Sequence, residues 1–563
     1  MEGEQSQLIA ANIRKARSLR DIAPEQYETP WCSFAQLLDE RARLTPQQIY
    51  LIYYEDKTGA RSEYSYAAFN RRVNQVANYL RDELGVKRGE RIATLSYNHP
   101  DTMLIFFACW KIGAVATPQN ASEDNVRIAF ILQNGACRVL LVMPEYLERA
   151  EAIQANAECV RKIVSLDGAY QKRLDTQADL FIAPAANMLE DECMLVYTSG
   201  TTGAPKGVVL SQYNLFADCK AMAGWQGMTP ASRMMCILPL HHMNGINVTH
   251  VLPMLVGSSV VLNRSFKANT FWQRVAAERV HIVSVVPTIL QFLCEANEDI
   301  SSMDLSACRH FICGAGTLAV SLVTRFEDRF GIKVMHGYGL SETTSFSCFT
   351  PLDLSPERHR YWFTHYGYPS IGVALPVNVM AIHDQDGRAL NAGEKGEILM
   401  RGHNVMLGYF KRDDANLESF KHGWFRSGDE GFFELDEKGR AFYFITGRLK
   451  ELINRGGVKY SPFEIEEVLL SCPGVKVGLA IAFDNDWYGE EVGAYVVKQE
   501  GVSLSEQQVL AHCRKHMPFA KAPKVAKFGT EVPVTATGKY QRLQLKSLFS
   551  DYQSEQFKDP RAL

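Results

Sequence analysis

The apolar positions in roughly the first 380 residues alternate between a helical and a strand-like spacing. Apolar residues within 69–84 recur every three or four positions, as in an amphipathic helix, and the apolar segment 100–112 begins with a proline, which is favourable in the first turn of a helix. Short apolar runs between such segments indicate buried strands, at residues 91–96, 139–142, 234–238, 259–262, 281–286 and 311–313. This alternation predicts layered α/β sheets.

The pattern of apolar residues changes after residue 377. Short alternating runs at residues 378–382 and 396–400 are separated by turn clusters such as Asp384–Gly387, which is typical of antiparallel strands. The sequence therefore predicts a small antiparallel β-barrel over about residues 377–445.

Beyond the Gly447–Arg448 pair, helical and strand-like runs return in a compact α+β unit. Two helices and two strands are indicated, at residues 462–470, 505–516, 479–483 and 493–497. Because 563 residues exceed what one hydrophobic core usually organises, we expect several parts. These are an N-terminal extension over 1–33, a large domain over 34–449 and a small C-terminal domain over 450–563.

Composition narrows the class of protein to a large soluble enzyme. The net charge is −3 with no long basic tract, which argues against nucleic acid as a partner. The 13 cysteines form no C-x-x-C pair, which favours a reduced, cytoplasmic setting. The apolar window 103–110 is interrupted by Lys111 and is too short for a transmembrane segment, and the polar N-terminus lacks the apolar core of a signal peptide.

The segment 197–207, which reads YTSGTTGAPKG, is the most informative in the chain. The apolar run 193–198 predicts a buried strand, so the loop after it should lie at the carboxyl end of that strand. Glycines let the backbone approach an anion closely, and hydroxyls with one ammonium can surround phosphate oxygens. Pro205 before Lys206 and Gly207 after it differ from the P-loop of common NTPases, in which Ser or Thr follows the lysine. The segment predicts a phosphate-binding loop of another kind.

Four further motifs follow this loop in a fixed order. They are HGYGLSETT at 336–344, GWFRSGD at 423–429, TGRLKELINRGG at 446–457 and PVTATGK at 533–539. Together with the loop, they make the chain resemble the adenylate-forming superfamily: acyl-CoA synthetases, peptide-synthetase adenylation domains and firefly-type luciferases. The resemblance extends from about Phe34 to Lys539. Such proteins activate a carboxylate with ATP and release pyrophosphate, and the ligase branch passes the acyl group to coenzyme A.

The resemblance implies a binding site for ATP and Mg²⁺. It assigns the β- and γ-phosphates to the loop residues Thr198, Ser199, Gly200, Thr201, Thr202, Gly203 and Lys206. Glu342 would bind Mg²⁺, since a hard cation prefers oxygen ligands, and Tyr338 would stack on adenine. Asp429 would accept the ribose hydroxyls, with a turn aspartate as the alternative, and Arg448 would contact ribose or phosphate. The motif residues around the purine are His336, Gly337, Gly339 and Ser341, with the turn Gly314, Ala315 and Gly316, for which a packing role is the alternative.

The resemblance also implies how the chemistry is divided between two steps. Lys539 would bridge the attacking carboxylate and the α-phosphate, where charge develops in the transition state. The smaller C-terminal domain would be mobile and turn about Lys450, withdrawing Lys539 and bringing Gly456 and Gly457 towards the pantetheine arm. A fixed linker is the alternative. His242 would gate the carboxylate pocket, so that Lys539, His242, Glu342 and Lys206 are the candidate catalytic residues.

These features predict an ATP-dependent acid–CoA ligase, with ATP, Mg²⁺ and coenzyme A as its small-molecule partners beside a carboxylic acid. No acidic residue lies within 238–248, which disfavours an α-amino acid, and Asn244 and Asn247 indicate a polar or short acyl group. The alternative is a stand-alone adenylating enzyme that loads a separate carrier protein; luciferase-type oxidation and a non-catalytic nucleotide-binding regulator rank below it. A homodimer is left open.

Overall fold

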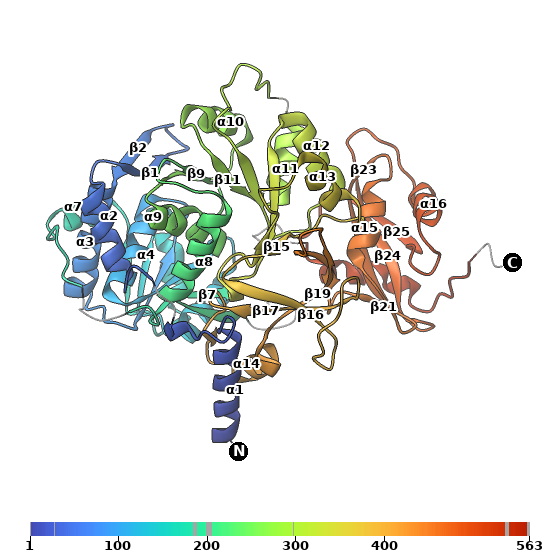
Figure 1. Cartoon of the computed structure of the whole chain (residues 1–563), viewed down its shortest axis with the longest axis horizontal. Helices are drawn as coiled ribbons and strands as arrows, with labels where there is room; N and C mark the ends of the chain where they lie inside the picture. The colour runs from blue at the N-terminus through green and yellow to red at the C-terminus, as the bar shows by residue number, and fades with distance from the viewer. Residues whose placement is uncertain are drawn as a thin grey trace.

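The computed structural model describes residues 2–26, 29–183, 188–198, 205–296, 298–534 and 540–559 (Figure 1). It is a mixed α/β protein with a large N-terminal domain and a smaller C-terminal domain at one side of it. The predicted fold class is confirmed. Among the described helices, none is long and apolar enough to cross a membrane.

The first sheet of the large domain contains the strands on either side of the segment predicted to bind phosphate. Its strand order is β18-β8-β7-β4-β3-β5-β6, and the four strands β4, β3, β5 and β6 run parallel in the manner predicted from the alternating pattern. The strands are β3 (Arg91–Leu95), β4 (Val115–Gln119), β5 (Val139–Val142), β6 (Lys162–Ser165), β7 (Glu192–Thr198), β8 (Lys206–Ser211) and β18 (Gly408–Tyr409). β7 and β8 are antiparallel neighbours, with Thr198 opposite Lys206, so the segment between them connects two adjacent strand ends.

The second sheet has nine strands in the order β15-β14-β13-β12-β11-β9-β10-β1-β2. Its parallel centre is β10, β9, β11, β12 and β13, and antiparallel strands lie at both edges. The strands are β1 (Ile49–Tyr54), β2 (Arg61–Ser65), β9 (Arg233–Cys236), β10 (Ser259–Asn263), β11 (Ile282–Val285), β12 (His310–Cys313), β13 (Lys333–Tyr338), β14 (Cys348–Phe349) and β15 (Val373–Ala374).

Helices cover the faces of these sheets and bury most of the apolar runs. They are α2 (Phe34–Leu44), α3 (Tyr66–Asn78), α4 (Pro100–Ile112), α5 (Asn125–Gly135), α6 (Leu147–Gln154), α7 (Gly168–Asp175), α8 (Gln212–Trp225), α9 (Leu252–Val256), α10 (Ala268–Ala277), α11 (Pro287–Glu295), α12 (Val320–Phe330) and α13 (Pro356–Thr364), with a π-helix at Asn244–Val251. Every residue of α4 is buried, which explains its lack of a polar face.

The end of α4 contains a buried charge. The Lys111 ammonium donates hydrogen bonds of 2.7 Å to oxygens of Asp39, Asn70 and Asn74, on α2 and α3. Burial lowers the pKa of Lys111, and the Asp39 carboxylate opposes that change. Each of the lysine's three protons therefore has an acceptor, as a buried ammonium requires.

The predicted antiparallel subdomain is a half-barrel of four strands. The order is β16 (Asn378–His383), β17 (Gly396–Gly402), β19 (Phe425–Leu435) and β20 (Ala441–Arg448), all antiparallel. Four strands are too few to close around a filled interior, so the sheet stays open and packs against the large domain. α14 (Asp413–Ser419) lies between β18 and β19 in the chain.

The C-terminal domain is built on a five-stranded sheet, of which the sequence indicates two strands, at residues 479–483 and 493–497. The order is β22-β21-β24-β23, and β25 pairs in parallel with β24. Its elements are β21 (Ile453–Arg455), β22 (Val458–Tyr460), α15 (Pro462–Leu470), β23 (Val475–Asn485), β24 (Gly489–Lys498), α16 (Glu506–His516) and β25 (Val525–Gly529).

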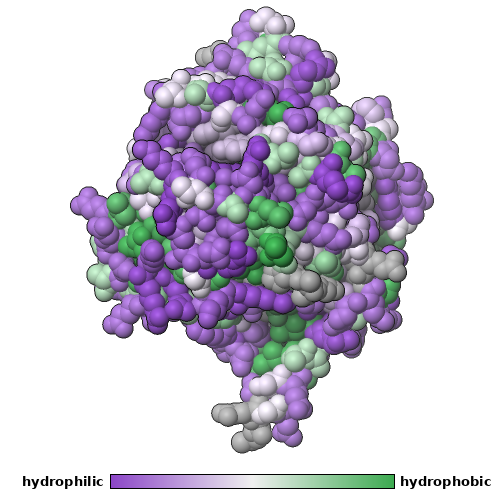
Figure 2. Space-filling view, turned by 90° about the vertical axis from the view of Figure 1, so that its left-hand side faces the viewer, coloured by the Kyte–Doolittle hydropathy of each residue, from purple (hydrophilic) through white to green (hydrophobic). Residues whose placement is uncertain are grey.

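The N-terminal extension contains a helix that the sequence pattern did not predict. α1 (Glu2–Ala16) projects from the body of the protein in both views, and its C-terminal half contacts α14 and β17 (Figures 1 and 2). The face shown in Figure 2 is mostly hydrophilic, with small separate apolar patches.

Candidate active site

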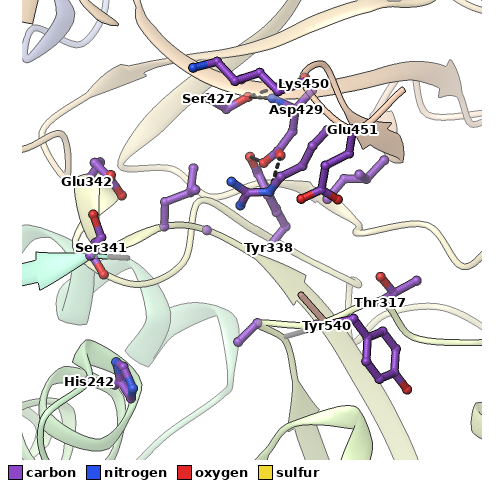
Figure 3. Close-up of a pocket in the computed structure, with 18 of the residues that line it drawn as sticks. His242, Thr317, Tyr338, Ser341, Glu342, Ser427, Asp429, Lys450, Glu451 and Tyr540 are labelled. Atoms are coloured by element: carbon purple, nitrogen blue, oxygen red, sulfur yellow. Dashed lines mark hydrogen bonds and ion pairs between the residues drawn. The ribbon is translucent and has the colours of Figure 1, made fainter. Parts of the chain in front are cut away.

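A cavity of about 960 Å³ lies where both large-domain sheets, the half-barrel and the C-terminal domain meet. Most of the predicted site residues line it, although they come from segments far apart in the sequence. These are Thr198, Lys206, His242, Ala315, Gly316, His336, Gly337, Tyr338, Gly339, Ser341, Glu342, Asp429, Arg448 and Lys450. Ser199, Gly200, Thr201, Thr202, Gly203 and Lys539 lie outside the described residues. Figure 3 shows part of this arrangement.

One wall of the cavity brings a cation and a carboxylate to the same tyrosine. The Lys206 ammonium lies 4.8 Å from the centre of the Tyr409 ring, and the Tyr409 hydroxyl donates a 2.8 Å hydrogen bond to Glu342 Oε1. Burial lowers the pKa of Lys206, and the nearby Glu342 carboxylate opposes that change. Burial raises the pKa of Tyr409, and the Glu342 carboxylate raises it further, so Tyr409 remains a hydrogen-bond donor.

Tyr409 is a site residue that sequence reasoning missed. It lies on β18, which pairs with β8 so that Tyr409 is opposite Val208, two residues from Lys206. Asn416 fixes the tyrosine main chain, because its side chain accepts from the Tyr409 N–H at 2.7 Å and donates to the Tyr409 carbonyl at 3.0 Å. A Gly-Tyr pair carries no chemical signal by itself; the pairing of strands two hundred residues apart creates the contact.

A second wall contains a buried carboxylate held between two donors. The Tyr338 hydroxyl donates to Asp429 Oδ2 at 2.7 Å, and Arg448 Nε lies 3.3 Å from Asp429 Oδ1. Asp429 and Arg448 are opposite each other on β19 and β20, so sheet register fixes this ion pair. The Asp429 carboxylate raises the pKa of Arg448, and burial, followed by Asp429, raises that of Tyr338. Asp429 is therefore a strand residue whose carboxylate is held in place by two donors, rather than an isolated turn residue.

The glycines of the 336–344 motif are required by packing. A Cβ at Gly339 would lie 2.0 Å from the Ser345 carbonyl oxygen, and one at Gly337 would lie 2.3 Å from the Phe349 ring. A Cβ at Gly314 would lie 2.7 Å from the Phe346 ring, which supports the packing role weighed for this turn, and Gly314 does not line the cavity. Its neighbour Ala315 does, in a left-handed conformation with φ of 67° that is strained for a residue with a side chain.

Histidines contribute polar groups to the wall of the cavity. The His241 and His242 rings are 4.3 Å apart and both line the cavity, and Figure 3 shows His242 far from Asp429 and Lys450. Burial lowers the pKa of His241 to about 4 and that of His336 to about 4, so both are uncharged at neutral pH. His336 Nδ1 lies 2.9 Å from the Ser370 carbonyl oxygen, which orients its ring. Asn244 and Asn247, from which a polar or short acyl group is predicted, do not line the cavity: Asn244 bonds to Ser284 and Asn247 to Asp218.

The C-terminal domain closes the remaining side. Residues 540–544, which directly follow Lys539, line the cavity together with Lys450 and Glu451. Arg542 anchors this segment: its guanidinium donates two 2.8 Å bonds to Glu466 and one of 3.1 Å to Glu451. Burial alone would lower the pKa of Arg542, but these carboxylates raise it, so it stays charged. Gly456 and Gly457 do not line the cavity; they form the turn between β21 and β22.

Comparison with known proteins shows the same combination of parts elsewhere. The AMP-binding enzyme family matches residues 38–410, and the C-terminal domain of AMP-binding enzymes matches residues 464–539. Sulfoacetate–CoA ligase of Cupriavidus necator is 32% identical over 464 residues, which cover 82% of this chain and 88% of that protein. Oxalate–CoA ligase of Arabidopsis thaliana is 30% identical over 484 residues, covering 84% and 90%. The structure of o-succinylbenzoate CoA synthetase from Bacillus subtilis with its acyl-adenylate intermediate has a TM-score of 0.78 at 28% identity, covering 91% and 97%.

Proposed function

The chain belongs to the AMP-binding enzyme family, in the acid–CoA ligase branch of the adenylate-forming superfamily, and on this premise we propose how its residues divide the reaction. An acid–CoA ligase first joins a carboxylate to the α-phosphate of ATP and releases pyrophosphate. It then transfers the acyl group from AMP to the thiol of coenzyme A.

The observation that carries the proposal is that two walls of one cavity each bring a cation and a carboxylate close together. The Asp429–Arg448 pair with Tyr338 suits a ribose and its adjoining phosphate, because a carboxylate can accept from two hydroxyls. Lys206, 4.8 Å from the Tyr409 ring, suits the polyphosphate. We assign adenine to the surface made by Ala315, Gly316 and Tyr338, which line the same cavity.

We assign Mg²⁺ to Glu342. Within the described residues no group of three or more His, Cys, Asp or Glu side chains could hold a metal by itself, so a protein cage for the ion is absent there. Mg²⁺ is commonly bound by one or two carboxylates together with substrate phosphates, and the buried Glu342 fits that pattern. The Tyr409 hydrogen bond engages Oε1 and leaves Oε2 as an acceptor. When bound, the ion would neutralise phosphate charge that otherwise repels the incoming carboxylate.

We assign the adenylation step to Lys539, and we assign to Lys450 the hinge about which the C-terminal domain turns between the two steps. The residues directly after Lys539 line the cavity, which supports an approach of its ammonium to the reacting groups. Charge develops on the α-phosphate oxygens in the transition state, and a preorganised cation there typically contributes 10²–10³ in rate. Lys450 lies between Arg448 and Glu451, at the junction of the two domains, where a change in few φ and ψ angles can turn the smaller domain.

For the acid, we propose a carboxylate with a second polar group. The His241 and His242 rings give one part of the cavity wall polar character, and burial keeps His241 uncharged. Relatives are named for sulfoacetate and oxalate, although one at 29% identity is named for long-chain fatty acids. We place the enzyme in the cytoplasm, because its 13 cysteines are all free thiols.

The test is pyrophosphate release across a panel of acids, with and without coenzyme A, beside the Lys539→Ala variant. The panel pairs short acids that carry a second carboxylate or sulfonate with unbranched alkyl acids of equal length. We expect CoA-stimulated turnover with the polar members and a loss of about 10²–10³-fold in the variant. Adenylate formation that coenzyme A does not accelerate would favour a carrier protein as the thiol donor. Full activity in Lys539→Ala would overturn the adenylation assignment.

A further inference from the structure

A second group of buried charges lies in the C-terminal domain, under the hairpin formed by β21 and β22. Its centre is the Glu491 carboxylate on β24, which is fully buried. Arg455 Nε approaches it from the hairpin, 2.8 and 2.9 Å from the two carboxylate oxygens. From the other side, Lys524 Nζ lies 3.1 Å from Glu491 Oε1 and donates a 2.6 Å hydrogen bond to the Ala522 carbonyl. We call Arg455, Glu491 and Lys524 the Glu491 network.

Burying the charges of the Glu491 network costs the C-terminal domain folding free energy. Two cations share one carboxylate, and the side chains of both Lys524 and Glu491 have no exposed surface. Burial lowers the pKa of Lys524 to about 8, and Glu491 opposes that change. Apolar residues of similar size often stabilise a protein as well as a buried ion pair does, so buried pairs are frequently kept because they fix one geometry. The element whose geometry this network can fix is the hairpin.

At its base the hairpin is attached through the buried Ile453 and a 2.7 Å hydrogen bond from the Asn454 N–H to Glu490 Oε2, but its turn has few other attachments to the sheet. Gly456 and Gly457 have φ angles of 60° and 85°, as in the type I′ turn that favours two-residue hairpins. β21 pairs with β24 at one position, Arg455 opposite Gly489, and the Gly456 N–H donates to the Tyr488 carbonyl at 2.8 Å. The Arg455 guanidinium also lies 3.7 Å from the centre of the Tyr488 ring. The direction of the glycine turn therefore depends on how firmly the Arg455 side chain is held.

The hairpin does not take part in the cavity. No residue of 453–460 lines it, whereas residues 540–544 of the same domain do. In this arrangement of the two domains, the Glu491 network is separated from the groups assigned to ATP and to the carboxylate. A role of the network in the reaction must therefore concern the other arrangement, in which the domain has turned.

We propose that Glu491 and Lys524 are positioning residues for thioester formation. They hold the Arg455 side chain, and through it they fix the conformation in which the β21–β22 hairpin contacts coenzyme A. This inference rests on the proposed function, in which the turned C-terminal domain presents the hairpin to coenzyme A. Glu491 acts through the two Nε contacts, and Lys524 acts by fixing Glu491 from behind. Adenylation uses a different part of the domain, residues 540–544, and does not need the network.

A purely structural role makes a different prediction. A network that only stabilised the domain would affect both half-reactions together, because residues 540–544 belong to the same folded unit. A positioning role separates the two half-reactions and acts on the Michaelis constant for coenzyme A.

The experiment measures the half-reactions separately in the full chain. Adenylation is followed as pyrophosphate release in a single turnover without coenzyme A, and transfer as loss of preformed adenylate on adding it. For Glu491→Gln and Lys524→Met we expect transfer to fall at least ten-fold, a higher Michaelis constant for coenzyme A, and adenylation within two-fold of wild type. Lys524→Arg should retain most of the transfer rate, since it keeps the buried positive charge.

Two further variants distinguish a positioning role from a loss of folding. Arg455→Lys keeps a charge on the hairpin but loses the contacts with Glu491 and Tyr488, and should show the same selective loss even if the buried variants fold poorly. Val509→Ala on α16 removes buried apolar volume elsewhere in this domain and should lower the melting temperature without separating the half-reactions. Equal loss in both half-reactions, or unchanged transfer in Arg455→Lys, would overturn the inference. A wild-type adenylate that coenzyme A fails to consume would instead contradict the proposed function, and this inference with it.

Discussion

The Tyr409 hydroxyl donates a hydrogen bond to Glu342 across 2.8 Å, and its ring lies under the Lys206 ammonium. One side chain thereby sets the separation between the residue assigned to Mg²⁺ and the residue assigned to the polyphosphate. Lys206 begins β8, and Tyr409 lies on the strand paired with β8, so the sheet itself fixes this distance.

Removing the Tyr409 hydroxyl should raise the concentration of Mg²⁺ that adenylation requires. Tyr409→Phe keeps the ring under Lys206 but loses a hydrogen bond to a carboxylate, a contact of about 1.5–3 kcal/mol. We expect adenylation to fall about ten-fold or more at limiting Mg²⁺, with partial recovery at high Mg²⁺. Tyr443→Phe is the matched control, since Tyr443 is a buried tyrosine whose hydroxyl bonds to the Met380 carbonyl outside the cavity. Identical magnesium titrations for both variants would contradict the role given to Tyr409.

Neutralising Asp429 should weaken ATP binding rather than acid binding. Asp429→Asn removes the charge that pairs with Arg448 and one acceptor for the proposed ribose contact. We expect the Michaelis constant for ATP to rise about ten-fold or more, with little change in that for the acid. Asp436→Asn is the control, because this aspartate is equally buried and pairs with Arg440 away from the cavity. An unchanged constant for ATP would refute the ribose assignment.

Fixing the backbone at Lys450 should separate the two steps. Proline restricts φ to about −65°, so Lys450→Pro limits the rotation proposed there. We expect pyrophosphate release in a single turnover to stay within a few-fold of wild type while thioester formation falls by a larger factor. Lys450→Ala, which keeps backbone freedom, controls for loss of the side chain. Equal losses in both steps for Lys450→Pro would argue for a fixed linker.

The protonation of Asp218, a fully buried carboxyl on α8, should contribute to the pH dependence of the protein's stability. Burial raises its pKa to about 8, while Asn247 and Ser345 donate hydrogen bonds to it. The usual value of about 3.9 applies to the unfolded chain, so between these values the folded state holds a proton that the unfolded state has lost. The stability from this group is complete below about pH 4 and is lost as pH rises towards 8.

Asp218→Asn cannot titrate and should escape this loss. We expect the melting temperature of the variant, measured relative to wild type, to increase steadily between pH 5 and pH 8 in thermal unfolding experiments. Melting curves that shift in parallel over this range would mean that Asp218 does not hold its proton in the folded protein.

Much of the fold could be predicted because it depends on local patterns. The segments 100–112, 139–142 and 462–470 coincide with α4, β5 and α15, since apolar spacing and a leading proline or turn mark their ends. Helix α1 was missed because its sequence is mostly polar and its order comes from contacts with distant elements such as α14.

The candidate site was predictable where a motif carries the chemistry. Asp429 and Arg448 could be named from two motifs, although their contact depends on the register of β19 with β20. Tyr409 could not be named from the sequence, because it reaches the site only through the pairing of β18 with β8 and through its hydrogen bond to Glu342. The position of Gly456 and Gly457 outside the cavity depends on how the C-terminal domain packs against the large domain, which no local pattern encodes.

The buried ammonium at the end of α4 has a consequence for how the chain folds. Lys111 becomes satisfied when Asp39, Asn70 and Asn74 arrive together from α2 and α3. Until then, a helix that is buried along its whole length carries an unpaired charge at its end, which disfavours collapse of α4 by itself onto the sheet. The three helices should therefore order in one cooperative event, and hydrogen exchange should give their most protected amides a common opening free energy.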